Sequence, residues 1–225
     1  MGAGGFPIDI VLFGMIAVFL VVRLRGILGR RSGFERPAEP RGGVRGPGVE
    51  SPVIDGVAER VTAPPPAPAR VLPDPATPVG QELTRMTAID RNFQPARFLD
   101  GAEAAFRIIV TAFAAGARDT LRPLLSEHCF TDFEAAITAR EAAGETQRTE
   151  VRAIENAAIE SAELRGSTAV IGVRFVSDQV NITMARDGSV AAGTDAVTEI
   201  ADHWIFERDL TATDPTWRLV AARNA

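Results

Sequence analysis

The sequence contains no lysine and no tyrosine, and it has one cysteine and two histidines among 225 residues. A single cysteine, Cys129, excludes an intramolecular disulfide and is typical of a reducing compartment. So few histidine and cysteine side chains exclude the usual zinc ligand sets. The absence of tyrosine excludes the pair of aspartate base and tyrosine oxyanion donor that some isomerases use. We therefore expect no metal and no cofactor.

The residues that remain for catalysis are not arranged as a catalytic pair. His128 and Cys129 are neighbours in a predicted helix, where consecutive side chains point about 100° apart. Asp202 and His203 are neighbours in a predicted strand and would face opposite sides; we expect them to make hydrogen bonds at the surface or at a strand end. The glycines at positions 42, 43, 46 and 48 precede no helix and form no phosphate loop. The sequence favours a binding protein, and an enzyme is the minor alternative.

Proline is concentrated in one segment of the chain. Eleven of the fifteen prolines lie between Pro37 and Pro78. Such a segment buries too little apolar surface to offset the entropy of ordering it, and its proline runs favour extended polyproline II. We predict a disordered linker over residues 32–80, acting as a tether in preference to a ligand for a proline-recognising module. Residues 81–225 then form one folded domain.

Charge is also segregated along the chain. Between Arg23 and Arg45 there are seven arginines and two glutamates, a local excess of five positive charges. Residues 81–225 hold fifteen arginines and twenty-two acidic residues, a net charge of −7. Phosphate binding requires a basic surface. The acidic domain therefore argues against nucleic acid as a partner.

An apolar segment, Phe6–Val22, has 17 residues and one charge, Asp9. This length is at the short end of bilayer-spanning helices, and arginines that follow it can extend to the headgroups. No basic residue precedes the segment and no small-residue cleavage site follows it, so a retained anchor over residues 1–31 is favoured over a cleaved signal peptide. The basic flank of this anchor consists of Arg23, Arg25, Arg30 and Arg31.

The position of this flank predicts the orientation of the chain. Arginines collect on the cytoplasmic side of a membrane span, so the protein would cross the membrane once and hold its C-terminal domain in the cytoplasm. The same arginines can contact anionic headgroups, which makes membrane lipid an expected partner.

The first half of the domain has helical periodicity. An apolar stripe predicts a helix that Asp100 caps, with Glu103 reaching back to the cap, and that ends at Gly116. Two more helices are predicted at residues 119–125 and 126–143, with Gly144 as the stop. A weakly amphipathic helix is predicted at residues 81–92.

The second half has the periodicity of strands. Strands are predicted at residues 151–163, 167–178, 197–208 and 217–222, with turns at Arg165-Gly166 and Asp187-Gly188. Helices followed by an antiparallel meander predict an α+β domain, with the helices against one face of a curved sheet.

A sheet that curves around helices can enclose a cavity, which is a natural ligand site. Eight large apolar residues of the predicted elements are candidates for its lining, and membership of the core is the more ordinary role for each of them. They are Phe106, Ile109, Phe113, Phe130, Phe133, Ile171, Phe175 and Trp204.

Four segments in this order resemble the bacterial TimA family: FLDGAEAAFRIIVTAFAAGARDTLRPLLS (98–126), VRFVSDQVN (173–181), HWIFERDL (203–210) and DPTWRLVAA (214–222). The segment IDIVLFGMIAVFLVVRLRGILGRR (8–31) is also similar to that family. TimA proteins are related to the C-terminal domain of the import-motor tether of the mitochondrial inner-membrane translocase. The resemblance implies a cystatin-like or nuclear-transport-factor-like cone with a large hydrophobic pocket.

The resemblance also implies a function. It suggests a non-enzymatic adaptor or scaffold at the cytoplasmic face of the bacterial inner membrane, linked to protein translocation or membrane-protein handling, with one or more unidentified proteins as partners. The alternative is a domain that binds an acyl chain or cardiolipin at the membrane surface, with the 81–92 helix lying on the bilayer. Because that helix is only weakly amphipathic, we favour the adaptor. The chain lacks the long region by which the mitochondrial relative recruits chaperones, so chaperone tethering is not implied.

Overall fold

The computed structural model describes residues 69–224. The predicted membrane anchor at residues 1–31 and most of the predicted linker lie outside these residues. Within residues 69–224, no helix is both long and apolar enough to cross a bilayer.

Four helices precede the long strands in the described part of the chain. They are α2 (Pro78–Ile89), α3 (Pro95–Ala115), α4 (Arg118–Leu121) and α5 (Glu127–Ala142). Three predicted boundaries are confirmed. Gly116 and Gly144 both have φ +70°, a left-handed conformation that glycine adopts without a steric penalty. Ser126 caps α5, and its Oγ accepts a hydrogen bond from the Cys129 N–H at 3.3 Å.

The predicted start of α3 is wrong. The helix begins at Pro95, five residues before the expected cap at Asp100. Proline suits the first position of a helix because its fixed φ is helical and its missing N–H would have no partner there. Asp100 and Glu103 instead bind Arg70: its Nη1 lies 2.7 Å from Asp100 Oδ1, and its Nε donates to Glu103 Oε1 at 3.0 Å.

The predicted linker boundary is also too late. Strand β1 (Ala69–Val71) and the first turn of α2 lie within the segment expected to be disordered, residues 32–80. The Arg70 ion pairs fasten β1 to α3, so the end of the proline-rich segment is ordered as part of the domain.

The sheet has the order β1-β2-β3-β4-β5. Its long strands are β2 (Thr146–Arg165), β3 (Thr168–Met184), β4 (Val190–Asp209) and β5 (Arg218–Asn224), all antiparallel to their neighbours. β1 pairs in parallel with β2, which makes the sheet mixed where an antiparallel sheet was expected. β2, β3 and β4 are longer than the predicted strands because the hairpins extend to the turns at Gly166 and Gly188, which have φ +62° and +82°.

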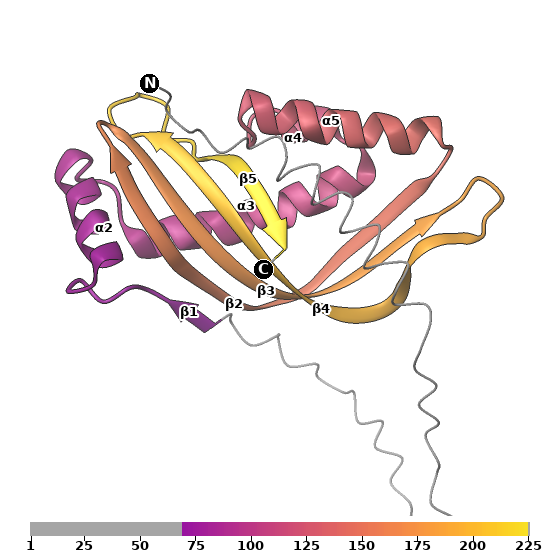
Figure 1. Cartoon of the computed structure of the whole chain (residues 1–225), viewed down its shortest axis with the longest axis horizontal. Coiled ribbons are helices and arrows are strands. Elements are labelled where there is room, and N and C mark those ends of the chain that lie inside the picture. The colour runs from indigo at the N-terminus through magenta and orange to yellow at the C-terminus, as the bar shows by residue number, and fades with distance from the viewer. Residues whose placement is uncertain (1–68, 225) are drawn as a thin grey trace, which may run out of the picture.

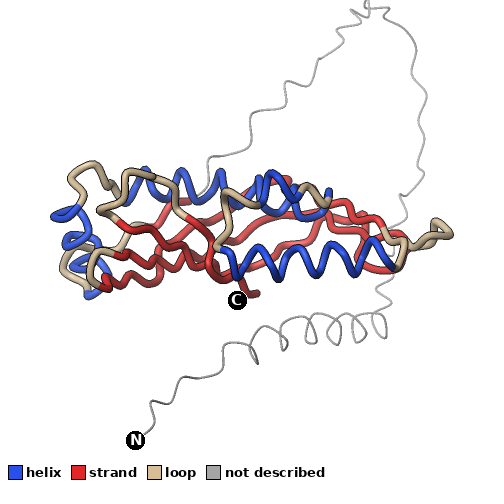
Figure 2. The backbone as a smooth tube through the Cα atoms, turned by 90° about the horizontal axis from the view of Figure 1, so that it is seen from above, coloured by secondary structure: helices blue, strands red, loops and turns tan. Residues whose placement is uncertain are grey.

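The sheet is strongly curved. β2 carries three register shifts against β3, between residues 151 and 161, and such bulges bend and twist a strand. Figure 1 shows β2 to β5 passing in front of α3, with α5 above, and Figure 2 shows both helices running along the long axis of the domain. The predicted helices on one face of a curved sheet are confirmed.

The core lies between α3, α5 and the sheet. Its centre is Phe106, whose ring centroid is 4.7 Å from those of both Phe175 and Trp204. Alternate residues of β3 are fully buried on the same face, from Ile171 to Ser177. Burial of each large side chain contributes about 1.5–3 kcal/mol, so these contacts hold α3 firmly to the sheet.

Candidate functional site

The eight predicted pocket residues divide into two groups. Six are at most 5% exposed and belong to the main core: Phe106, Ile109, Phe130, Ile171, Phe175 and Trp204. Phe113 and Phe133 are half-buried and pack on each other with ring centroids 5.0 Å apart. Their arrangement is that of a packed core, and a role in lining a ligand cavity stays a prediction.

The structure has a groove elsewhere, between the first half of α3, the loop before it, and the neighbouring ends of β4 and β5. Its volume is about 280 Å³. None of the eight predicted residues lines it. We call it the 93–217 groove; its lining is Asn92, Phe93, Gln94, Arg97, Phe98, Gly101, Ala102, Ala105, Leu124, Phe206, Arg208 and Trp217.

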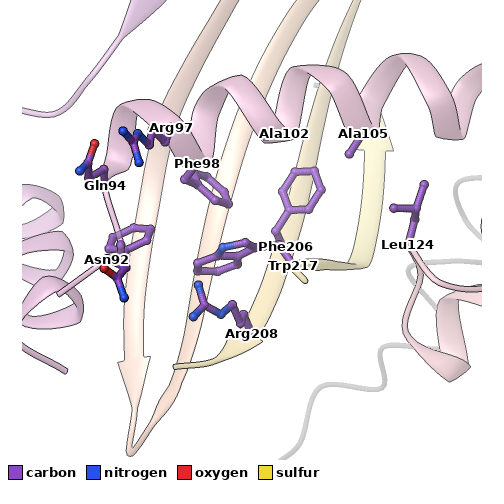
Figure 3. Close-up of a pocket in the computed structure, with 12 residues that line it drawn as sticks. Asn92, Gln94, Arg97, Phe98, Ala102, Ala105, Leu124, Phe206, Arg208 and Trp217 are labelled. Carbon is purple, nitrogen blue, oxygen red and sulfur yellow. The ribbon is translucent and has the colours of Figure 1, made fainter. Parts of the chain in front are cut away.

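Aromatic rings form one wall of the 93–217 groove (Figure 3). Phe98 projects from α3 against Trp217, with centroids 4.7 Å apart, and lies 5.9 Å from Phe206. The ring centroids of Phe93 and Trp217 are 5.7 Å apart. Phe93 immediately precedes the cap residue of α3 and Phe98 is the fourth helical residue, which is the spacing of a hydrophobic staple. The sequence Phe93-Gln94-Pro95 contains this signal, which the periodicity of the apolar residues does not record.

An ion pair lies beside this wall. Arg208 Nη2 donates to Asp90 Oδ2 at 2.6 Å, and each side chain is 12% exposed. The backbone N–H of Asn92 and the Arg208 guanidinium hold the pKa of Asp90 below its usual value. The guanidinium carbon also lies 5.9 Å from the centroid of the Trp217 ring, within the range of a cation–π contact.

Asp202 and His203 lie on opposite faces of β4, as expected; Asp202 is half-buried and His203 is buried. Asp202 pairs in register with Phe175, on the side of the helices, and burial raises its pKa to about 6. His203 is 9% exposed on the other face, where its Nε2 is 3.9 Å from Glu160 Oε2. Burial and the charge of Arg223 lower the pKa of His203. Because the strand separates the two side chains, they form no acid–base pair.

Cys129 is buried in the core, and its thiol pKa is raised to about 12 by burial and by the nearby charge of Asp132. The thiolate is the reactive form, so we expect the native protein at about pH 8 to react with a disulfide reagent at least about 100-fold more slowly than the unfolded chain. Release of thionitrobenzoate from Ellman's reagent, with and without guanidinium chloride, measures both rates. Fast modification of the folded protein would show that Cys129 is open to solvent.

Within residues 69–224, no group of three or more histidine, cysteine, aspartate or glutamate side chains is placed to hold a metal ion. The 93–217 groove itself contains no nucleophile with an adjacent base. What it offers is an apolar surface next to arginine side chains, an arrangement suited to binding.

Comparison with known families gives one match. The Tim44-like domain matches residues 79–224, which covers α2 to β5 and therefore every residue of the 93–217 groove. No curated protein matches the chain.

Solved structures of similar shape were also found. The intermembrane space region of the chloroplast protein ARC6 aligns with 10% identity and a TM-score of 0.43, over 59% of this chain and 97% of that chain. A nuclear transport factor 2-like superfamily protein from Salmonella enterica serovar Typhimurium aligns with 9% identity and a TM-score of 0.37, over 59% of this chain and 92% of that chain. A conserved protein from Planctomyces limnophilus aligns with 17% identity and a TM-score of 0.35, over 58% and 96% of the two chains.

Proposed function

The chain belongs to the Tim44-like domain family, and on that basis we propose that it is a non-enzymatic adaptor that binds another protein through the 93–217 groove. The observation that carries the proposal is the groove itself, where four aromatic side chains meet an arginine in a cavity of about 280 Å³. Binding energy at protein interfaces is concentrated where an anchor side chain fills such a pocket.

The size of the groove favours a protein anchor over a lipid. Ligand cavities for small molecules usually measure about 300–1,000 Å³, and this one, at about 280 Å³, suits one large side chain. A domain that lies on a bilayer needs a continuous apolar face. The exposed large apolar residues of the described part lie elsewhere, and none lines the groove: Val71, Leu72, Ile89, Ile108, Val190 and Val197.

Gly101 provides a direct test of this proposal. It lines the groove, and a Cβ at this position would meet no atom within 4 Å. A long side chain therefore has room to extend over the groove, and replacing a helical glycine also favours the helix by about 0.5–1 kcal/mol. We expect Gly101→Met to block the groove and to leave the fold intact, and Gly101→Ala is the matched control.

The test is photo-crosslinking of the full-length protein in its native membranes. A benzophenone amino acid replaces Gln94, which lines the groove, or Val190, which is exposed at the start of β4 and does not line it. We expect discrete protein adducts from position 94 only, retained with Gly101→Ala and lost with Gly101→Met. Adducts with lipid alone, or equal adducts from both positions, would refute the adaptor groove.

We further propose that the chain is of the bacterial TimA type and is held at the cytoplasmic face of the inner membrane by residues 1–31, with protein translocation or membrane-protein handling as the process it serves. The basic flank at Arg23, Arg25, Arg30 and Arg31 supports this orientation. Extraction of membranes with alkaline carbonate should leave the full chain in the pellet and release a variant that lacks residues 1–31. Release of the intact full chain would overturn the anchor.

A further inference from the structure

We infer that the 93–217 groove recognises the C-terminal end of a protein partner, that is, an apolar last side chain together with its free α-carboxylate. This inference rests on the proposed function, because it names the part of the partner that the groove binds. Three features of the groove support it: an apolar wall, an uncapped helix N-terminus, and a lining that contains two arginines and no acidic residue.

The apolar wall defines the first half of the ligand. Phe93, Phe98, Phe206 and Trp217 surround a space of about 280 Å³. Phe206 is 1% exposed and Phe93 and Phe98 are at most 5% exposed, so packing against the rest of the core fixes the positions of these rings. Such a surface is preformed for one large apolar side chain, and binding costs little reorganisation.

The N-terminus of α3 supplies positive potential at the same groove. Gln94, the cap residue, makes no side-chain hydrogen bond to the helix, and the first turn contains no acidic residue. The first N–H groups of a helix carry a partial positive charge that attracts anions. Arg97 lies in this first turn and adds a full charge, and both Gln94 and Arg97 line the groove.

Arg208 is a second arginine in the lining. Its Nη2 donates to Asp90 Oδ2 at 2.6 Å, and the residue lines the groove beside Trp217. Hydrogen bonds from arginine to a carboxylate are charge-assisted and strong, so the ligand should carry an anionic oxygen as well as apolar surface.

The charges around the groove specify an anion. Arg97 and Arg208 line the groove and no acidic residue does. Arg208 is paired with Asp90, whereas Arg97 has no ion-pair partner among the described residues, which leaves one uncompensated positive charge in the lining. A single carboxylate neutralises this excess. An α-carboxylate is directly attached to the last residue of a chain, so the charge and the apolar side chain reach the groove together.

A protein terminus fits better than a lipid, the other common source of an anionic group on an apolar chain. Several acyl chains do not fit in about 280 Å³. A domain that enters a bilayer needs exposed large apolar side chains. None of the exposed large apolar residues in the described part of the chain lines the 93–217 groove.

The test measures binding of labelled peptides to the full chain in mild detergent by fluorescence anisotropy. The probe is a pool of N-terminally fluorescein-labelled hexapeptides that end in leucine or phenylalanine, prepared with a free C-terminus or with a C-terminal amide. We expect the free acid to bind at least about tenfold more tightly, since hydrogen bonds to charged groups are the strong ones. Arg97→Gln should weaken the free acid about threefold and leave the amide unchanged.

Two variants act as controls. Arg91→Gln removes an arginine that is also exposed but does not line the groove, and it should leave both affinities unchanged. Gly101→Met should abolish binding of both peptides. Equal binding of acid and amide, or equal effects of the Arg97 and Arg91 substitutions, would overturn the inference and leave the adaptor proposal standing. Failure of both peptides, with binding of fluorescent palmitate or of anionic phospholipid vesicles instead, would overturn both.

Discussion

Replacing Arg208 with methionine is expected to lower the free energy of unfolding by about 2 kcal/mol near pH 7. The substitution keeps an unbranched side chain of similar length at this position but leaves the Asp90 carboxylate, 12% exposed, without its 2.6 Å partner. Removing one member of a fully enclosed ion pair costs about 3–5 kcal/mol. We expect less here because the pair lies beside an open groove, where water reaches the remaining carboxylate. Urea unfolding followed by far-ultraviolet circular dichroism gives the value.

The pH dependence of this effect follows from Asp90. Its pKa is lowered in the folded state, first by the Asn92 N–H and then by Arg208. A lowered carboxyl pKa contributes stability above the unfolded value, near 3.8, and that stability is lost as the pH falls through the folded pKa. The difference between the Arg208→Met variant and the natural protein should therefore be largest at neutral pH and shrink in strong acid.

Arg218 provides a matched control for this experiment. It lies on β5 and pairs with Asp214 at 3.2 Å, but both side chains are more than 50% exposed. Exposed pairs contribute about 0–1 kcal/mol, so Arg218→Met should change stability little. The double variant Asp90→Asn/Arg208→Met should recover much of the loss, because neither group is then charged. A loss for Arg208→Met that is the same at pH 3 and pH 7 would show that packing, and not the ion pair, is responsible.

Much of the fold could be predicted because its signals are local. Gly116, Gly144, Gly166 and Gly188 all have positive φ and lie at the ends of helices or in hairpin turns, where glycine has the least strain. Spacing of three and four residues in α3, and of two residues in β3 from Ile171, predicted which faces are buried. These signals placed the helices and strands but left the strand ends uncertain by several residues.

The groove could not be predicted because its parts come from distant segments. Asp90 and Arg208 are 118 residues apart in the sequence, and Trp217 reaches Phe98 only when β5 lies beside β4 and α3 crosses the sheet. No periodicity in one segment records such a contact. The local staple of Phe93 and Phe98 marks one side of the groove, and the other side depends on the order of the strands.

The same reason explains why the predicted cap of α3 was wrong and why the domain begins earlier in the chain than predicted. Asp100 and Glu103 have the spacing of a capping box, yet their carboxylates form ion pairs with Arg70, about thirty residues earlier in the chain. A long-range ion pair and a local cap use the same residue types. Pro95 was the stronger local signal, since its geometry fits only the first turn of a helix.

Asp202→Asn is expected to stabilise the protein by about 2 kcal/mol at pH 8. Asp202 lies on the helix-facing side of β4, and no hydrogen bond to its carboxylate is present among the described residues. Burial raises its pKa from 3.8 to about 6, and a tenfold change in an acid dissociation constant corresponds to about 1.4 kcal/mol. We expect somewhat less than this pKa difference implies because part of the carboxyl group still contacts water. An amide carries no charge to desolvate, so the variant loses this penalty.

The contribution of Asp202 to the free energy of unfolding changes with pH in the opposite direction to that of Asp90. Below the unfolded pKa, near 3.8, Asp202 is protonated in both states and costs nothing. As the pH rises from about 4 to about 6, the unfolded chain releases this proton more readily than the folded protein, and folding is progressively weakened. The gain from Asp202→Asn should thus be full at pH 8, fall between pH 6 and pH 4, and approach zero below. Chemical unfolding at three pH values measures this profile.

Asp195 is the matched control, since it lies on the same strand, is exposed and has no ion-pair partner among the described residues. Asp195→Asn should change stability by less than about 0.5 kcal/mol at every pH. If Asp202→Asn instead lowers stability at pH 8, the carboxylate must have a favourable partner in solution, and the inner face of β4 would then be a polar binding surface. A gain confined to neutral and alkaline pH identifies Asp202 as a half-buried charge without a favourable partner on the helix-facing side of β4.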